Sequence, residues 1–150
     1  MKVITDLLLV KRDNPRRPVI PISIGMVDFL EALCDFGSSV DIMLRVHYKK
    51  NFTHPLLETA MCLQLADHML SFPKGILKNL CVRVGTLYAP VDFMVIETGT
   101  DERAPILGRP FLNTSGAVIY ASAAKISFYI KGMKETFSFK NKTTQISEQS

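Results

Sequence analysis

Short apolar segments separated by turn residues run along most of this chain, and this pattern constrains its fold more than any other feature. The predicted strands are 19–24, 27–34, 40–43, 59–65, 76–84, 87–96, 105–108, 117–120, 125–130 and 136–139. Gly25 and Gly85-Thr86 lie where two hairpin turns are expected. Pro21 marks the first of these strands as an edge strand or a bulged one. Many short strands at even spacing predict a closed or sandwich-like all-β domain.

Little helical periodicity is present. The polar segment 45–51 predicts a short helix or a loop, and 109–114 predicts one or two helical turns closed by Gly116. The polar segment 98–104 predicts a loop. We therefore expect one modest helix beside the strands.

Length and composition indicate one globular domain. The chain has 150 residues, of which 47% are hydrophobic and 21% charged, and this excludes a mostly disordered protein. The apolar run 7–10 is followed by Lys11 and Arg12 and is too short for a membrane helix or a secretory signal. We expect an intracellular, cytoplasmic protein that is not secreted and has no membrane partner.

The net charge of +4 lies at the two ends of the chain. Residues 1–17 carry +3 and residues 131–150 carry +2, which leaves −1 for 18–130. A nucleic-acid surface requires a basic stripe on the folded body, so nucleic acid is not expected to be a partner. The predicted organisation is a basic N-terminal tail (1–17), a folded domain (18–140) and a polar C-terminal tail (141–150).

The cysteines predict neither a disulfide framework nor a metal site. Cys34, Cys62 and Cys81 are odd in number, and no pair has the C-x-x-C spacing of a zinc knuckle. Free, buried thiols in a reducing compartment are the prediction.

Two segments are the candidates for a chemical role. Leu33-Cys34-Asp35-Phe36-Gly37-Ser38 places an acid directly after an apolar strand, where glycine lets backbone N–H groups approach the carboxylate. Ile106-Leu107-Gly108-Arg109 places two apolar residues before a glycine and a helix start. Asp35 either has a chemical role or caps the turn through backbone hydrogen bonds. Asp41 and Asp92 are interpreted as surface charges.

Together these segments resemble the retropepsin-like aspartic proteases, most closely the protease segment of plant Ty3/gypsy-type retrotransposon polyproteins. That family reads hydrophobic-hydrophobic-Asp-x-Gly-(Ala/Ser) in the first motif and Ile-Leu-Gly-Arg in the second. Leu63-Gln64-Leu65-Ala66-Asp67 followed by Pro73-Lys74-Gly75 resembles its flap hairpin, and Pro90-Val91-Asp92-Phe93 its strand before the second motif. The resemblance extends from about Pro18 to Phe139, in the family's order and spacing.

The resemblance implies a small closed β-barrel lobe with one short helix after the second motif. It also implies an aspartic endopeptidase without metal or organic cofactor, which acts on a polypeptide. Asp35 is the implied catalytic residue. Since the chain has one Asp-x-Gly motif, a homodimer would supply the second aspartate.

The same resemblance implies roles for other residues. Ala66, Asp67, His68 and Met69 would cover the substrate as the flap, although Asp67 and His68 can equally form a solvated hairpin tip. Gly37 would be required for the backbone geometry of the turn and not for direct contact with the substrate. Ser38 either donates a hydrogen bond to the carboxylate or only fits the turn.

The second motif (Ile106, Leu107, Gly108 and Arg109) would be architectural. Gly108 and Arg109 are expected to pack beneath the acid loop and near the dimer interface. Phe36 stands where the best-known members carry Thr or Ser, so a hydroxyl donor is absent and bulk is added near the dimer axis. An alternative function is therefore a catalytically inactive, retroelement-derived domain that dimerises or binds peptides.

Overall fold

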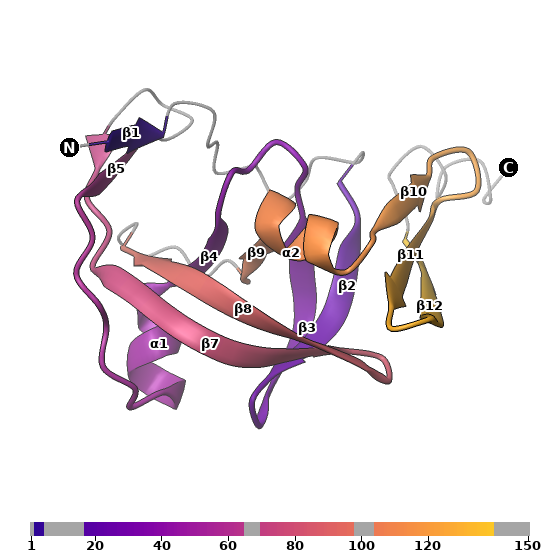
Figure 1. Ribbon diagram of the computed structural model, residues 1–150, viewed down its shortest axis with the longest axis horizontal. Coiled ribbons are helices and arrows are strands. Elements are labelled where there is room, and N and C mark those ends of the chain that lie inside the picture. The colour runs from indigo at the N-terminus through magenta and orange to yellow at the C-terminus, as the bar shows by residue number, and fades with distance from the viewer. Residues whose placement is uncertain (1, 5–16, 65–69, 98–103, 140–150) are drawn as a thin grey trace, which may run out of the picture.

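The computed structural model describes residues 2–4, 17–64, 70–97 and 104–139. Six strands close a barrel in the order β2-β3-β9-β4-β8-β7 (Figure 1). These strands are β2 (Val19–Ile24), β3 (Val27–Cys34), β4 (Asp41–Leu44), β7 (Gly75–Val84), β8 (Leu87–Ile96) and β9 (Ile106–Leu107). The predicted all-β barrel is confirmed.

Two hairpins form most of the barrel wall. Gly25 joins β2 to β3 at φ 59°, and Gly85 joins β7 to β8 at φ 61°. Glycine adopts this left-handed backbone without a steric penalty, so both turns form where the sequence predicts them. Pairing between β2 and β7 then closes the barrel.

Pro21 coincides with a change of register between β2 and β3. Ile20 pairs with Ala32 but Ile22 pairs with Phe29, so one residue of β2 faces two residues of β3. Proline has no N–H to donate to the ladder, which is why a proline is tolerated at such a bulge. The shift determines which residue before β2 lies opposite the end of β3.

The two-residue strand β9 lies between β3 and β4. It pairs parallel to β3, with Leu33 opposite Ile106 and Cys34 opposite Leu107. It also pairs antiparallel to β4 through Ile42. The two sequence motifs, far apart in the chain, therefore share one layer of hydrogen bonds.

Two short helices accompany the barrel. Helix α2 (Arg109–Thr114) follows β9 as predicted and buries Phe111 and Leu112. Helix α1 (Arg45–Asn51) forms in the segment for which a helix or a loop was expected. Neither of these, nor any other helix in the described ranges, is long and apolar enough to cross a membrane.

Two three-stranded sheets flank the barrel. One contains β1 (Lys2–Ile4), β5 (Met61–Gln64) and β6 (Leu70–Ser71). The other contains β10 (Val118–Tyr120), β11 (Lys125–Ile130) and β12 (Met133–Ser138). Strand β12 begins earlier than the predicted 136–139, because Lys131 (φ 52°) and Gly132 (φ 78°) form a two-residue hairpin turn that the sequence pattern did not reveal.

The predicted N-terminal tail is partly built into the fold. Lys2–Ile4 pair in parallel with Met61–Leu63, so these residues belong to a sheet. Arg17 contacts the acid loop, which is the connection between β3 and β4 (residues 35–40). The remainder of that tail and the predicted C-terminal tail (141–150) lie outside the described residues.

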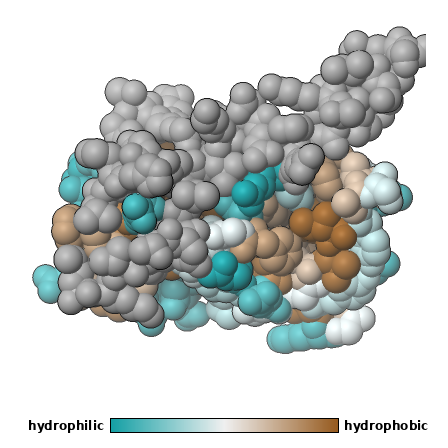
Figure 2. All heavy atoms as spheres, turned by 90° about the horizontal axis from the view of Figure 1, so that it is seen from above, coloured by the Kyte–Doolittle hydropathy of each residue, from teal (hydrophilic) through white to brown (hydrophobic). Residues whose placement is uncertain are grey.

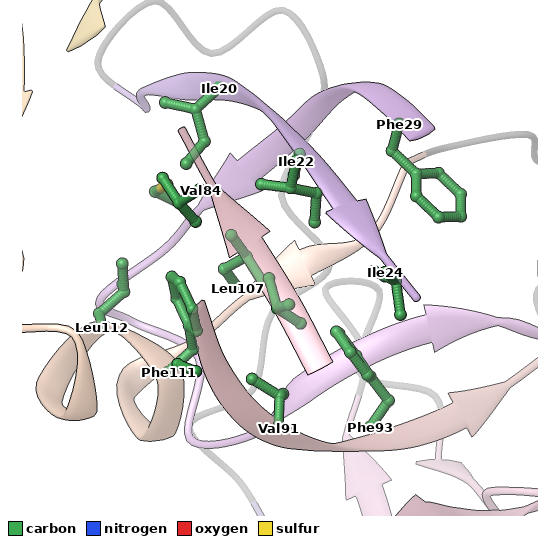
Figure 3. Packing of buried hydrophobic residues seen from close by; sticks show 14 of the residues in the cluster. Ile20, Ile22, Ile24, Phe29, Val84, Val91, Phe93, Leu107, Phe111 and Leu112 are labelled. Carbon is green, nitrogen blue, oxygen red and sulfur yellow. The ribbon is translucent and has the colours of Figure 1, made fainter. Parts of the chain in front are cut away.

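The core follows the period of two expected for strands. In β8, Leu87, Ala89, Val91 and Phe93 are buried and the residues between them are exposed. Side chains from β2, β8, β9 and α2 point into the same interior (Figure 3). This packing fixes β9 and α2 against the barrel.

Truncating the core at Phe93, which is fully buried, is expected to destabilise the fold. Phe93→Ala should lower the free energy of unfolding by about 3–5 kcal/mol, because a large cavity remains. The control is Leu30→Ala at a residue 83% exposed, with an expected change within about 0.5 kcal/mol. Urea denaturation measures both, and equal effects would contradict this core assignment.

Candidate active site

Asp35 lies where β3 ends and its backbone is held by the second motif. Its N–H donates to the carbonyl oxygen of Leu107 at 2.9 Å, and its own carbonyl oxygen accepts from the N–H of Ser38 at 3.1 Å. The first bond continues the β3–β9 ladder and the second closes a tight turn. This acid therefore has a fixed position at the end of the barrel.

The Asp35 carboxylate is almost completely buried, with 1% of its side chain exposed. Its Oδ1 accepts hydrogen bonds from the Gly37 N–H at 2.8 Å and from the Arg17 guanidinium. Within the described residues, two buried side-chain atoms have no hydrogen-bond partner, and both belong to this loop: Asp35 Oδ2 and Ser39 Oγ. Buried polar groups are rarely left unpaired, so the polar atoms of this loop are the least satisfied in the described part of the chain.

Arg17 is a site residue that the sequence analysis missed. Val19 pairs with Leu33, so the same antiparallel register places residue 17 opposite residue 35. The Cys34 N–H donates to the Pro18 carbonyl oxygen at 2.9 Å and holds this register to the end of the strand. The sequence did contain one signal for this contact, the bulge expected at Pro21. Without that bulge, strand pairing counted from the Gly25 turn would place residue 16, and not residue 17, opposite Asp35.

The acid loop is stabilised from within and by the second motif. The Ser38 hydroxyl donates to the Val40 carbonyl oxygen at 2.6 Å, which supports the turn-fitting role over a bond to the carboxylate. A Cβ at Gly37 would lie 3.1 Å from Asp35 Oδ1, so glycine allows this close approach. Phe36 is 37% exposed, and its carbonyl oxygen accepts from Arg109 at 3.3 Å.

The second motif packs directly beneath this loop. A Cβ at Gly108 would lie 2.2 Å from the Val40 carbonyl oxygen, a distance that excludes any larger residue. The Arg109 N–H donates to the Ser38 carbonyl oxygen at 2.9 Å. Ile106 and Leu107 are buried in β9.

Neither a family model nor a curated protein matches the sequence. Solved structures do match. The crystal structure of the retroviral protease-like domain of Ddi1 from Leishmania major is 19% identical, covers 79% of this chain and 87% of its own, and superposes with a TM-score of 0.56. The EIAV protease complexed with the inhibitor HBY-793 is 17% identical, covers 73% of this chain and 98% of its own, with a TM-score of 0.53. The chain has the retropepsin-like protease fold.

In this retropepsin-like lobe, the acid loop lies at the upper edge of Figure 1, and Figure 2 looks onto that face. Apolar and hydrophilic residues alternate over the part of this face that is coloured, and the largest apolar group lies at the right of Figure 2. A separate cleft of about 510 Å³ lies against α2 and is lined by Asp41 and Asp92 but not by Asp35.

Asp41 corrects a sequence expectation, because it is buried and is not a surface charge. Its Oδ1 accepts from the N–H groups of Gly108 at 2.6 Å and Phe111 at 3.4 Å, so it supports the start of α2. Burial raises the pKa of Asp41 to about 7; the two N–H donors lower it and nearby Asp92 raises it. The sequence could not show this, because the partners come from a distant segment. Asp92, in contrast, is a surface charge as expected: its side chain is half exposed and pairs with Lys78 at 3.5 Å.

The predicted flap residues Ala66, Asp67, His68 and Met69 lie outside the described residues. On either side of them, β5 and β6 pair antiparallel, with Gln64 opposite Leu70.

The three cysteines are free, but only Cys34 and Cys62 are buried. Cys81 is exposed, contrary to expectation, because the alternation along β7 points it outward. Burial, and secondarily the charge of Asp35, raises the pKa of the Cys34 thiol, which makes it a poor nucleophile. Within the described ranges, no group of three or more His, Cys, Asp or Glu side chains could hold a metal ion.

Asp41 should make stability depend on pH. Its pKa is raised on folding, from 3.8 to about 7, so between these values the folded protein retains a proton that the unfolded chain releases. The retained proton contributes to the free energy of unfolding. This contribution is fully present below about pH 4 and is lost as pH rises to about 7, by at most about 1.4 kcal/mol per pH unit. Asp41→Asn should gain stability relative to wild type over that range in urea titrations. A pH-independent difference between the two proteins would contradict the buried-acid assignment.

Gly108→Ala should destabilise the protein by about 3 kcal/mol, because the added methyl group meets a backbone oxygen that cannot rotate away. Gly132→Ala is the control. Nothing lies within 4 Å of its Cβ position, so only the left-handed backbone opposes it, at about 1 kcal/mol. Thermal or urea denaturation compares the two, and equal losses would show that crowding at Gly108 is unimportant.

Proposed function

We propose that this chain is an aspartic endopeptidase that works as a homodimer. The observation that carries the proposal is the buried Asp35 carboxylate, whose Oδ2 lacks a partner among the described residues, at the end of a retropepsin-like barrel. One oxygen of this carboxylate accepts a hydrogen bond from the Gly37 N–H, and the other is available to form a hydrogen bond with a further polar group.

The chemistry requires two carboxylates. Placed close together, they share one proton, since both cannot ionise a few ångströms apart. The ionised carboxylate removes a proton from a water molecule, and the oxygen of that water attacks the peptide carbonyl carbon. The protonated carboxyl group donates its proton to the carbonyl oxygen. The C–N bond then breaks as one carboxyl group gives a proton to the amide nitrogen and the other carboxylate removes a proton from a hydroxyl of the tetrahedral intermediate, so that the carboxylic acid forms and the dyad again holds one proton.

A second copy of the chain is the proposed source of the other carboxylate. The sequence contains one Asp-Phe-Gly segment, so a single chain supplies one acid in such a loop. Twofold symmetry would place Asp35 of each subunit opposite its copy.

The proposed substrate is an extended polypeptide, covered by residues 66–69. The inhibitor complex of the EIAV protease, a structural neighbour, supports a ligand site in this fold. The motif resemblance to plant Ty3/gypsy-type polyproteins suggests a retroelement polyprotein as the substrate. An intracellular location, with free thiols, is consistent with that role.

A second candidate function is favoured by one observation. Arg17 forms an ion pair with Asp35, and a carboxylate that serves only as a partner for arginine needs no second aspartate. In that case the chain would be an inactive, retroelement-derived module for dimerisation or peptide binding. Phe36, exposed beside the acid, would then contribute to a binding surface.

Replacement of Asp35 separates the two functions. The purified chain should cleave an unfolded protein at mildly acidic pH, and pepstatin should inhibit it. Asp35→Asn should reduce the cleavage rate by about 10²–10⁴-fold, because a positioned acid–base group is lost. Asp92→Asn is the control at a half-exposed acid and should retain activity.

Cleavage that survives Asp35→Asn would contradict the aspartic mechanism. Absence of cleavage by a wild-type protein shown to be dimeric in sedimentation experiments would favour the binding module.

A further inference from the structure

The ion pair between Arg17 and Asp35 is the most unusual electrostatic feature of the site. Arg17 retains 28% exposure of its side chain, whereas Asp35 retains 1%. An ionised carboxylate buried to this extent is stable only with a partner, and here the guanidinium and the Gly37 N–H both bind Oδ1. In the described structure, Arg17 therefore acts as the counter-ion of the proposed catalytic acid.

This arrangement conflicts with the requirements of a two-carboxylate site. A dyad needs a second carboxyl group within hydrogen-bond distance of Asp35 and one proton shared between them. A guanidinium is always charged and has donors only, so it cannot take part in sharing that proton. Arg17 occupies Oδ1 and leaves Oδ2 unpartnered, but its fixed positive charge favours an ionised Asp35 over a carboxyl group that shares a proton, so Arg17 opposes formation of the dyad.

The position of Arg17 permits its side chain to move away from the Asp35 carboxylate. It precedes β2, and the last backbone bond that holds this end of the strand is donated by Cys34 to Pro18. Its guanidinium reaches solvent, so a released Arg17 would be hydrated without disruption of the barrel core. The Asp35 backbone, in contrast, is held by β9.

We propose that Arg17 is an autoinhibitory latch, which binds Asp35 in the single chain and must leave the carboxylate before two Asp35 side chains form a dyad. This inference rests on the proposed function, because it assumes that Asp35 is catalytic in a homodimer. Formation of the dyad then includes the cost of breaking the ion pair. Any variant without this ion pair should dimerise more tightly.

Sedimentation equilibrium of Arg17→Gln tests the latch, because glutamine retains a hydrogen-bond donor but no charge. The dimer dissociation constant should fall by about tenfold, which corresponds to about 1.4 kcal/mol. Arg16→Gln changes the net charge equally, one residue earlier in the sequence, and should match wild type. A dissociation constant for Arg17→Gln within about twofold of wild type, or no detectable dimer, would overturn the proposal.

Loss of Arg17 leaves a buried carboxylate without its counter-ion, so Arg17→Gln can fail to fold. Arg17→Lys then carries the test, since it keeps the charge but loses the planar fork of donors. It should tighten the dimer by about threefold, and an unchanged or weaker dimer would overturn the latch.

Peptidase assays of the same variants separate this proposal from the proposed function. A tighter Arg17→Gln dimer that cleaves faster than wild type supports both. A tighter Arg17→Gln dimer without cleavage refutes the peptidase and, with it, an autoinhibitory role for Arg17. Equal dimerisation and equal cleavage by wild type and Arg17→Gln refute the latch and leave the peptidase standing.

Discussion

The insertion of β9 between β3 and β4 is the interaction on which the site depends. Through it, Leu107 accepts a hydrogen bond from Asp35, and Arg109 donates one to Ser38. Gly108 makes this possible because its Cα lies against the Val40 carbonyl oxygen, where no side chain fits. Two segments about seventy residues apart are thereby combined into one rigid loop support, and the acid keeps its place without a helix or a disulfide.

Two buried aspartates in this region illustrate how environment assigns different roles to the same side chain. Asp41 accepts backbone N–H groups from the start of α2, and its burial raises its pKa to about 7. Asp35 instead has a guanidinium and one N–H on one oxygen, and its other oxygen is unpartnered within the described part of the chain. The first aspartate completes a local structure. Within the described residues, nothing completes the second aspartate in the same way.

Local chemistry made much of the fold predictable. The Gly25 and Gly85 turns, the strands beside them and the helix after Gly108 all depend on neighbouring residues, and they formed where expected. The Lys131-Gly132 turn was missed because lysine is an unusual residue for a left-handed backbone. Asp41 and Arg17 were misjudged for a different reason: their partners come from other strands, and a charged residue read in isolation looks solvated.

The sequence by itself determined an all-β domain and singled out Asp35 and its glycine, because strand alternation and turn chemistry are local properties. Only the tertiary structure decided what surrounds that acid. The bulge at Pro21 moves the register by one residue, and this one-residue shift brings Arg17 opposite Asp35. Register and barrel closure are sums of many long-range contacts, so the charge next to the carboxylate became visible only once the strands were paired.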